Sequence, residues 1–408
     1  MREGWEIKKL GEVCDFQNGF AFKSNTYKEN GLPILRITNI QNQSLEINDL
    51  VYFDKKDYKE NFDKFKVIKD DLVIAMSGAT TGKLGINKTE TVFYLNQRVG
   101  KFIPKKDILK PFLYYFLSTK VEESLRIAAG AAQPNLSTEQ INSFEIPVPP
   151  LAEQQRIVTI LAEAFDAIAK AKANTEQNLK NAKGLFESYL QGVFGNKGDG
   201  WEETSLNTEI DLLTGFAFKS NLYSEFNEDI LLIRGDNIMQ GDFRWNDAKR
   251  WRKDEYQTYQ KYQLKENDVV LAMDRPWVKA GLKCAMVSKN LLPALLVQRT
   301  ACLRCKENID HSFLFLLIKS KAFVNYLLNV QTGIGVPHIS GQQILNFNFS
   351  MPKLVGQQTI VQKLDALSVE TKKLEAIYQK KLEDLEELKK SILQKAFSGE
   401  LTEKEVLV

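Results

Sequence analysis

The sequence predicts an α+β protein in which two similar mixed α/β domains are separated by two long antiparallel coiled-coil helices. The first observation is a repeat, because the string GFAFKSN occurs at 19–25 and returns letter for letter at 215–221. The second is a pair of long proline-free stretches, 151–194 and 354–397. The third is the rest of each half, where short apolar runs alternate with Gly, Asn and Asp turns as in small sheets. Together they predict an internal pseudo-two-fold repeat.

The repeat spans the whole chain. Besides GFAFKSN, each half has a Gly-Trp-Glu start, an apolar strand ending in Met, a Gln-Arg pair and a Pro-x-Leu-x-x-Gln-Gln motif. These segments are 4–6 and 200–202, 70–76 and 267–273, 97–98 and 298–299, and 149–155 and 352–358. Two-fold molecules usually bind partners that are themselves nearly two-fold, and duplex DNA is the commonest of these.

Length and composition limit the classes of protein. With 408 residues the chain can form two domains of about 150 residues, each burying its own core. No apolar run reaches the roughly 18 residues of a membrane span, and the N-terminus lacks the apolar core of a secretory signal. Four cysteines then indicate a reducing compartment, so we expect a cytoplasmic protein. Because the net charge is only +3, a DNA-binding face would have to concentrate its basic residues locally.

The expected domains are 1–150 and 196–353, and the expected helices are 151–195 and 354–408, the last with a C-terminal tail. Strands and helical stretches should recur in matched pairs within the domains. We expect strands at Ile34–Ile40, Leu72–Met76, Arg98–Ile103, Ile230–Arg234, Val269–Met273 and Arg299–Cys305, and helical stretches at 111–127 and 311–328.

The apolar spacing of the long helices indicates how they pack. In each helix, apolar residues fall on the two seam positions of a heptad, which suits two helices that pack against each other. The seam residues are Ile157, Leu161, Ala164, Ile168, Ala171, Ala182, Leu185 and Tyr189, then Ile360, Leu364, Leu367, Leu374, Tyr378, Leu385, Leu388 and Ile392. Equivalent helices of a pseudo-symmetric chain must run antiparallel. The alternative is that each helix packs on its own domain.

No catalytic arrangement occurs in both copies, although a symmetric activity would require one. The two histidines, His311 and His338, both lie in the second half. Cys302 and Cys305 have the spacing of half a zinc site, but no second pair accompanies them. The segment SGATTGK at 77–83 resembles a phosphate loop but is one residue short between its glycines. We therefore expect a non-catalytic chain that binds no metal and no cofactor of its own.

A comparison of the two copies is more informative. They share framework residues and diverge in polar loops, as two domains that read different DNA sequences would. Arg, Lys, Asn, Gln and Asp carry donors and acceptors that match base edges and phosphates. The alternative for any of them is an ordinary solvent loop, and Phe20 and Phe22 are expected in the core. The candidate DNA-binding residues are Lys23, Arg36, Asn39, Ser77, Thr80, Lys83, Arg98, Gln133, Asn135, Lys219, Arg234, Asn237, Asp274, Arg275, Lys279, Lys283, Arg299, His338 and Ser340.

Three features carry a resemblance to a known family: the paired GFAFKSN strings, IPVPPLAEQQRIV at 146–158 and LQKAFSGEL at 393–401. With them, the chain resembles the specificity subunits of type I restriction-modification systems over essentially its whole length. The resemblance implies two target-recognition domains, each reading half of a split DNA sequence in the major groove. It also implies that the long helices set the unread gap and dock two methyltransferase subunits, which carry S-adenosylmethionine. ATP- and Mg-dependent restriction subunits can join such complexes.

The resemblance suggests roles for the candidate residues. Phosphate contacts that set the register would come from Lys23, Lys83, Lys219 and Lys279. Base reading would come from the loops 77–83, 133–137, 274–283 and 337–340, with Arg98 and Arg299 contacting guanine or phosphate. A rival interpretation from another class is a coiled-coil scaffold that assembles proteins and never touches DNA. It predicts no basic face and no salt-dependent DNA affinity.

Overall fold

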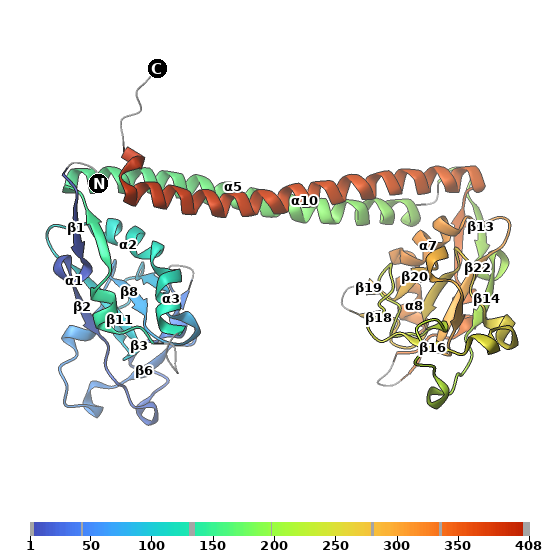
Figure 1. Cartoon of the computed structure of the whole chain (residues 1–408), viewed down its shortest axis with the longest axis horizontal. Coiled ribbons are helices and arrows are strands. Elements are labelled where there is room, and N and C mark those ends of the chain that lie inside the picture. The colour runs from blue at the N-terminus through green and yellow to red at the C-terminus, as the bar shows by residue number, and fades with distance from the viewer. Residues whose placement is uncertain are drawn as a thin grey trace, which may run out of the picture. The chain divides into compact units, whose positions relative to one another are not determined.

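The computed structural model describes residues 4–41, 44–129, 135–196, 198–278, 281–333 and 337–402. The chain divides into two compact units, one comprising Met1–Glu176 with Lys380–Val408 and the other Gln177–Gln379. Each unit contains an α/β domain and one end of the pair formed by the long helices α5 (Leu151–Gly195) and α10 (Leu354–Ser398) (Figure 1).

Two larger sheets form the domain of the first unit. Their strands are β2 (Cys14–Asn18), β3 (Leu32–Leu35), β4 (Ile40–Gln41), β5 (Ser44–Leu45), β6 (Val51–Phe53), β7 (Lys66–Val67), β8 (Leu72–Ala75), β9 (Leu84–Ile86), β10 (Phe93–Leu95) and β11 (Val99–Pro104). The sheet orders are β2-β11-β8-β9-β5-β4 and β6-β3-β10-β7. A separate antiparallel pair, β1 (Glu6–Lys9) with β12 (Glu145–Val148), joins the start of the domain to its end. The strand expected over 34–40 is wrong in its second half, because β3 ends at Leu35 and a turn follows.

The second unit repeats this topology. Its strands are β13 (Glu202–Ser205), β14 (Ile210–Thr214), β15 (Ile230–Ile233), β16 (Lys249–Trp251), β17 (Val269–Ala272), β18 (Trp277–Val278), β19 (Gly281–Leu282), β20 (Cys284–Met286), β21 (Ala294–Leu296), β22 (Thr300–Cys305) and β23 (Asn348–Met351). The orders β14-β22-β17-β20 and β16-β15-β21 match β2-β11-β8-β9 and β6-β3-β10, and β13 pairs with β23 as β1 does with β12. The internal repeat expected from the sequence is therefore present in the fold.

Short helices cover the sheets in both domains. They are α1 (Leu10–Val13), α2 (Lys110–Thr119), α3 (Val121–Ala129) and α4 (Thr138–Asn142), then α6 (Leu206–Glu209), α7 (His311–Lys319), α8 (Lys321–Val330) and α9 (Gly341–Leu345). The helical stretches expected at 111–127 and 311–328 therefore each consist of two helices, α2 with α3 and α7 with α8. In the second unit the break falls at Ser320, whose hydroxyl caps the N-terminus of α8 by accepting from Phe323 N at 3.3 Å. Among the described residues, no single helix is long and apolar enough to cross a membrane, although the bent pair α7–α8 passes that test by length and composition.

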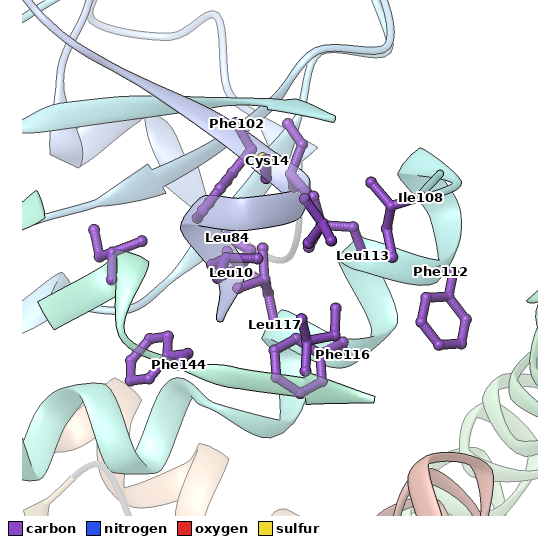
Figure 2. Close-up of a cluster of buried hydrophobic side chains, with 14 of the residues drawn as sticks. Leu10, Cys14, Leu84, Phe102, Ile108, Phe112, Leu113, Phe116, Leu117 and Phe144 are labelled. Carbon is purple, nitrogen blue, oxygen red and sulfur yellow. The ribbon is translucent and has the colours of Figure 1, made fainter. Parts of the chain in front are cut away.

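One core cluster of the first domain lies between α2 and the six-stranded sheet, and another lies among the strands and turns around Phe22 and Phe53. Phe112, Leu113, Phe116 and Leu117 recur at the spacing of one helix face and are all buried. Figure 2 shows these side chains gathered with those of α1 and with Phe102 of β11. The corresponding face of α7 is buried in the same way in the second domain. This packing holds the sheet, and with it the loops at the strand ends, in a fixed position.

The long helices pack both on each other and on the domains. In the first unit, Ile157 and Leu161 near the start of α5 cluster with Leu393 and Ala396 near the end of α10. Farther along α5, Lys172 Nζ lies 2.6 Å from Glu386 Oε1 of α10. Residue numbers of the contacting pairs therefore rise along α5 as they fall along α10. The pair is therefore antiparallel. Its contacts with the domains include aromatic pairs: Phe397 lies 5.2 and 5.6 Å from the rings of Phe112 and Phe116, and Phe194 lies 5.2 Å from that of Phe313.

The seam expected from the heptad pattern is wrong at several positions. Leu185 and Tyr189 are 46% and 43% exposed, whereas Leu190 is fully buried. On α10, Leu388 is 47% exposed, whereas Leu393, which lies next to the expected seam residue Ile392, is 8% exposed. An α-helix has 3.6 residues per turn, so a strict 3.5-residue repeat drifts around its surface over several turns. The buried stripe consequently moves to neighbouring residues.

A buried glutamine fastens each long helix to its domain. Gln154 in α5 is fully buried; its Oε1 accepts from Leu109 N at 2.8 Å, and its Nε2 donates to Asp107 O and Pro149 O, both at 2.9 Å. Gln357 in α10 makes the same three bonds in the second unit, with Asp310 N, Asn308 O and Pro352 O. Because the amide is bonded on both sides, it fixes the direction in which the helix leaves the domain.

Candidate nucleic-acid interface

The GFAFKSN motif is a close approach between two segments of backbone. A Cβ added at Gly19 would lie 2.0 Å from Asn96 O, and one at Gly215 would lie 2.1 Å from Val297 O. No side chain fits there, so glycine is required in both copies. The next residue, Phe20, donates its N–H to Leu95 O at 2.9 Å. The motif therefore pins its segment beside the end of β10 in the first domain and β21 in the second.

The aromatic residues of the motif belong to the core. Phe22 and Phe218 are buried, and Phe20 packs edge-on against the rings of Tyr58 and Phe62. They are placed as expected for core residues, and their faces are not open for base stacking. Lys23 and Lys219 follow them and are exposed. The motif thus exposes one lysine in each domain, on a segment that is anchored by a buried phenylalanine.

Two candidate asparagines stabilise turns. Asn39 is 2% exposed; its Oδ1 accepts from Arg36 N at 3.0 Å and its Nδ2 donates to Asn48 O at 3.3 Å. Asn237 is 3% exposed and bonds Arg234 N and Arg244 O in the same manner. Their amides are bonded inside the protein and almost fully buried, so in this structure they stabilise turns, and a contact with DNA stays a prediction. Asx-type turns use asparagine for this purpose, and a sequence pattern does not separate the two roles.

One backbone ladder brings three distant loops together in each domain. In the first, Met76 N donates to Arg98 O at 2.9 Å and Leu136 N donates to Met76 O at 2.7 Å. The ladder therefore brings Arg98 together with Ser77, which follows Met76, and Asn135, which precedes Leu136, at the strand ends. The second domain repeats the ladder at Met273, Arg299 and Ile339, and so gathers Asp274, Arg299 and His338. The loops that diverge most between the copies thus meet at equivalent places.

In the first domain, Ser77 Oγ and Thr80 Oγ1 of this junction, together with Arg36 Nε, are buried and find no hydrogen-bond partner among the described residues. Arg36 keeps one bond, from Nη2 to Asp49 O at 2.7 Å. Buried polar groups are nearly always satisfied by protein or by ordered water, so these atoms are available to water or to another molecule. Lys83, Arg98 and Asn135 are exposed beside these atoms.

In the second domain, the junction opens into a cleft of about 1170 Å³. Six basic side chains line it: Arg234, Lys249, Arg250, Arg275, Lys283 and Arg299. Four acidic ones, Glu225, Asp236, Asp247 and Asp274, line it as well. Burial lowers the pKa of Lys283, and the neighbouring Arg244 and Arg275 act in the same direction against Asp236. The six basic and four acidic side chains leave the cleft with a formal charge of +2, a small local excess of positive charge.

Several cleft cations are paired internally. Arg234 Nη2 lies 2.8 Å from Asp236 Oδ2, Lys249 Nζ lies 2.7 Å from Asp247 Oδ1, and Arg299 Nη1 lies 2.8 Å from Asp274 Oδ2. These pairs are accessible to water and contribute little to stability. They do orient the side chains along the wall of the cleft.

The residues of the cleft differ in part from the residues predicted from the sequence. Lys249 and Arg250 line the cleft but were not predicted, although the run KRWRK at 249–253 is a basic patch interrupted by an aromatic. Ser340 Oγ accepts from Gln343 N at 3.2 Å as the cap of α9, and a contact between this hydroxyl and DNA stays a prediction. Gln133 and Lys279 lie outside the described residues. Within the described ranges, no group of three or more His, Cys, Asp or Glu is placed to hold a metal ion.

Both repeats match one protein family. The model for the type I restriction modification DNA specificity domain matches residues 2–181 and again 198–386. The chain belongs to this family. It is therefore a DNA-specificity subunit, a recognition component and not a catalytic one.

Relatives of known name support the same assignment over the full length of the subunit. The type I restriction enzyme MjaVIII specificity subunit of Methanocaldococcus jannaschii is 25% identical, covering 98% of this chain and 93% of the relative. The EcoKI specificity subunit of Escherichia coli is 26% identical, covering 98% and 90%.

Two solved structures share the fold of the subunit. A chain from a type I R-M system aligns with a TM-score of 0.74 at 17% identity, covering 98% of this chain and 99% of that one. The HsdS subunit from Thermoanaerobacter tengcongensis aligns with a TM-score of 0.64 at 17% identity, covering 98% of each.

Proposed function

We propose that this specificity subunit reads a bipartite DNA target within a type I restriction-modification complex. The domains 1–150 and 196–353 would each read one half-site. The helices of 151–195 and 354–408 would set the unread gap between them. The observation that carries the proposal is the three-loop junction, which is built twice on the same backbone ladder with different side chains. The same backbone ladder carrying different polar side chains suits two domains that recognise different DNA sequences.

The contacts divide into two kinds. Lys23 and Lys219 are exposed on equivalent rigid motifs, so they would contact phosphates and set the register in both half-sites. The divergent residues at the junctions would contact base edges. The unpaired atoms of Ser77 and Thr80 in the first domain favour this division, because a bound partner would satisfy them.

Methyl transfer would belong to partner subunits. Methyltransferase subunits, two in number, would bring S-adenosylmethionine and flip the target base, and restriction subunits would bring ATP and Mg chemistry. Apolar side chains exposed on α5 and α10 suit such docking, among them Val355, Val369, Ile377 and Leu185. Val355-Gly356 stands where the first copy has Ala152-Glu153, which would make the two docking surfaces unequal.

The test is co-expression with the methyltransferase subunit of the same system, followed by single-molecule mapping of methylated adenines on host DNA. The proposal expects a split motif with a constant unread gap. A stable complex that methylates no defined motif would instead favour the protein-assembly scaffold. Salt-dependent binding of the purified subunit to duplex DNA separates the two further, because the scaffold has no need of it.

A further inference from the structure

The cleft of the second domain contains a carboxylate fixed from two sides. Asp274 Oδ1 lies 2.5 Å from His338 Nδ1, and Asp274 Oδ2 accepts from Arg299 Nη1 at 2.8 Å. The Asp274 side chain is 23% exposed and lines the cleft. Its partners come from the two other loops of the junction, so all three loops together set the position of this one group.

The two copies differ at this carboxylate and agree at its arginine. Arg98 and Arg299 are equivalent, and both follow the glutamine of the shared Gln-Arg pair. Asp274 and His338 stand where the first domain has Ser77 and Asn135. A shared arginine cannot by itself make two domains read different sequences. The difference must come from the groups that diverge.

An ionised carboxylate has only acceptors, with about four lone-pair positions on its two oxygens. His338 and Arg299 occupy one position on each oxygen, which leaves others directed elsewhere. A carboxylate repels phosphate, so it is poorly suited to backbone binding. The donors that base pairs present in the major groove are the exocyclic amino groups, N4 of cytosine and N6 of adenine.

The backbone at the junction is held in an unusual conformation. Arg299 and Arg275 adopt positive φ angles of 64° and 45°, although neither is glycine. Such conformations persist only where surrounding structure enforces them, and they cluster at functional sites. Arg275 N donates to Pro337 O at 2.9 Å, and Arg299 O accepts from Met273 N at 2.9 Å, so both are fastened to the ladder of the junction.

We propose that Asp274 reads the exocyclic amino group of one base in the half-site of the second domain. Arg299 and His338 are positioning residues that hold the carboxylate, and Ser77 takes the corresponding place in the first domain with a different preference. This inference rests on the proposed function, because it requires that the domain face a DNA half-site.

The test is motif mapping on the complete complex with Asp274→Asn and Asp274→Ser. Asparagine keeps the size and adds a donor, and serine is the residue of the first copy. We expect discrimination at one base pair of the second half-site to fall roughly ten- to hundred-fold, while the first half-site and the gap stay unchanged. Asp211→Asn is the matched control, since Asp211 is another carboxylate of the second domain that pairs with a cation, Lys306, but is not among the residues that line the cleft, and it should leave the motif intact.

A duplex-binding experiment then identifies the contacted group. Removing the exocyclic amino group at the affected base should weaken binding by the unmutated complex and should not weaken binding by the Asp274 variants further. Arg299→Lys keeps the charge but loses the planar fork, so it should loosen discrimination at the same base pair. An unchanged motif, or a loss spread evenly over all positions, overturns the inference. Failure of the unmutated complex to yield any split motif would instead overturn the proposed function.

Discussion

The hydrogen bonds by which Gln154 fastens α5 to the domain of the first unit can be tested by replacing Gln154 with leucine. The substitution removes three hydrogen bonds of 2.8–2.9 Å and leaves Leu109 N, Asp107 O and Pro149 O without that partner. At about 1 kcal/mol for each lost bond in a largely buried place, the first unit should be destabilised by about 3 kcal/mol. Leucine has a similar volume to glutamine, so the loss comes from the polar contacts and not from a cavity.

Hydrogen exchange followed by mass spectrometry measures this effect in one unit at a time. Peptides that cover 107–110 and 149–154 should exchange about 150-fold faster in Gln154→Leu, whereas peptides of the second unit should be unaffected. Gln155→Leu is the matched control, because its side chain is exposed next to Gln154. If the peptides of Gln154→Leu exchange at the rate of those in Gln155→Leu, the three hydrogen bonds of Gln154 do not stabilise the first unit.

Three further predictions concern the helices and the cations. Inserting seven residues into both α5 and α10 at facing positions adds about 10 Å, so the unread gap in the methylation motif should grow by about three base pairs with both half-sites unchanged; a constant gap would contradict the role of the helices. Phe397→Ala should destabilise the first unit by about 3 kcal/mol in thermal unfolding, as Phe194→Ala should the second, because each loses aromatic packing on its domain. Lys23→Ala and Lys219→Ala should each lower the slope of log Kd against log salt by about one without altering the motif; an altered motif would mean that these lysines read bases.

The duplication and the fold class followed from sequence because the repeated positions carry strict physical demands. Gly19 and Gly215 admit no side chain, and a buried glutamine recurs at the start of each long helix, so the repeat survives where neighbouring residues diverge. The pairing of the long helices followed from the absence of proline and the apolar spacing. The register did not, because the heptad pattern places Leu185 in a seam that the real helical period gives to Phe186 and Leu190.

The candidate site was predicted less completely. Asn39 and Ser340 carry the right chemistry for DNA, and their side chains also stabilise a turn and a helix cap, which are local bonds that become visible only in the folded structure. The grouping of Asp274, Arg299 and His338 depends on a ladder between strands that lie far apart in the chain. The basic run at 249–253 was visible in the sequence. Its location in the cleft required the fold.

We propose that the two domains read separate half-sites through interchangeable scaffolds. The most direct measurement replaces residues 200–352 with residues 4–149 and maps the methylated motif of the resulting complex. We expect a symmetric motif, in which the first half-site appears twice in inverted orientation across the same unread gap. A motif that keeps the original second half-site, or one that lacks this symmetry although the complex still methylates DNA, would contradict it.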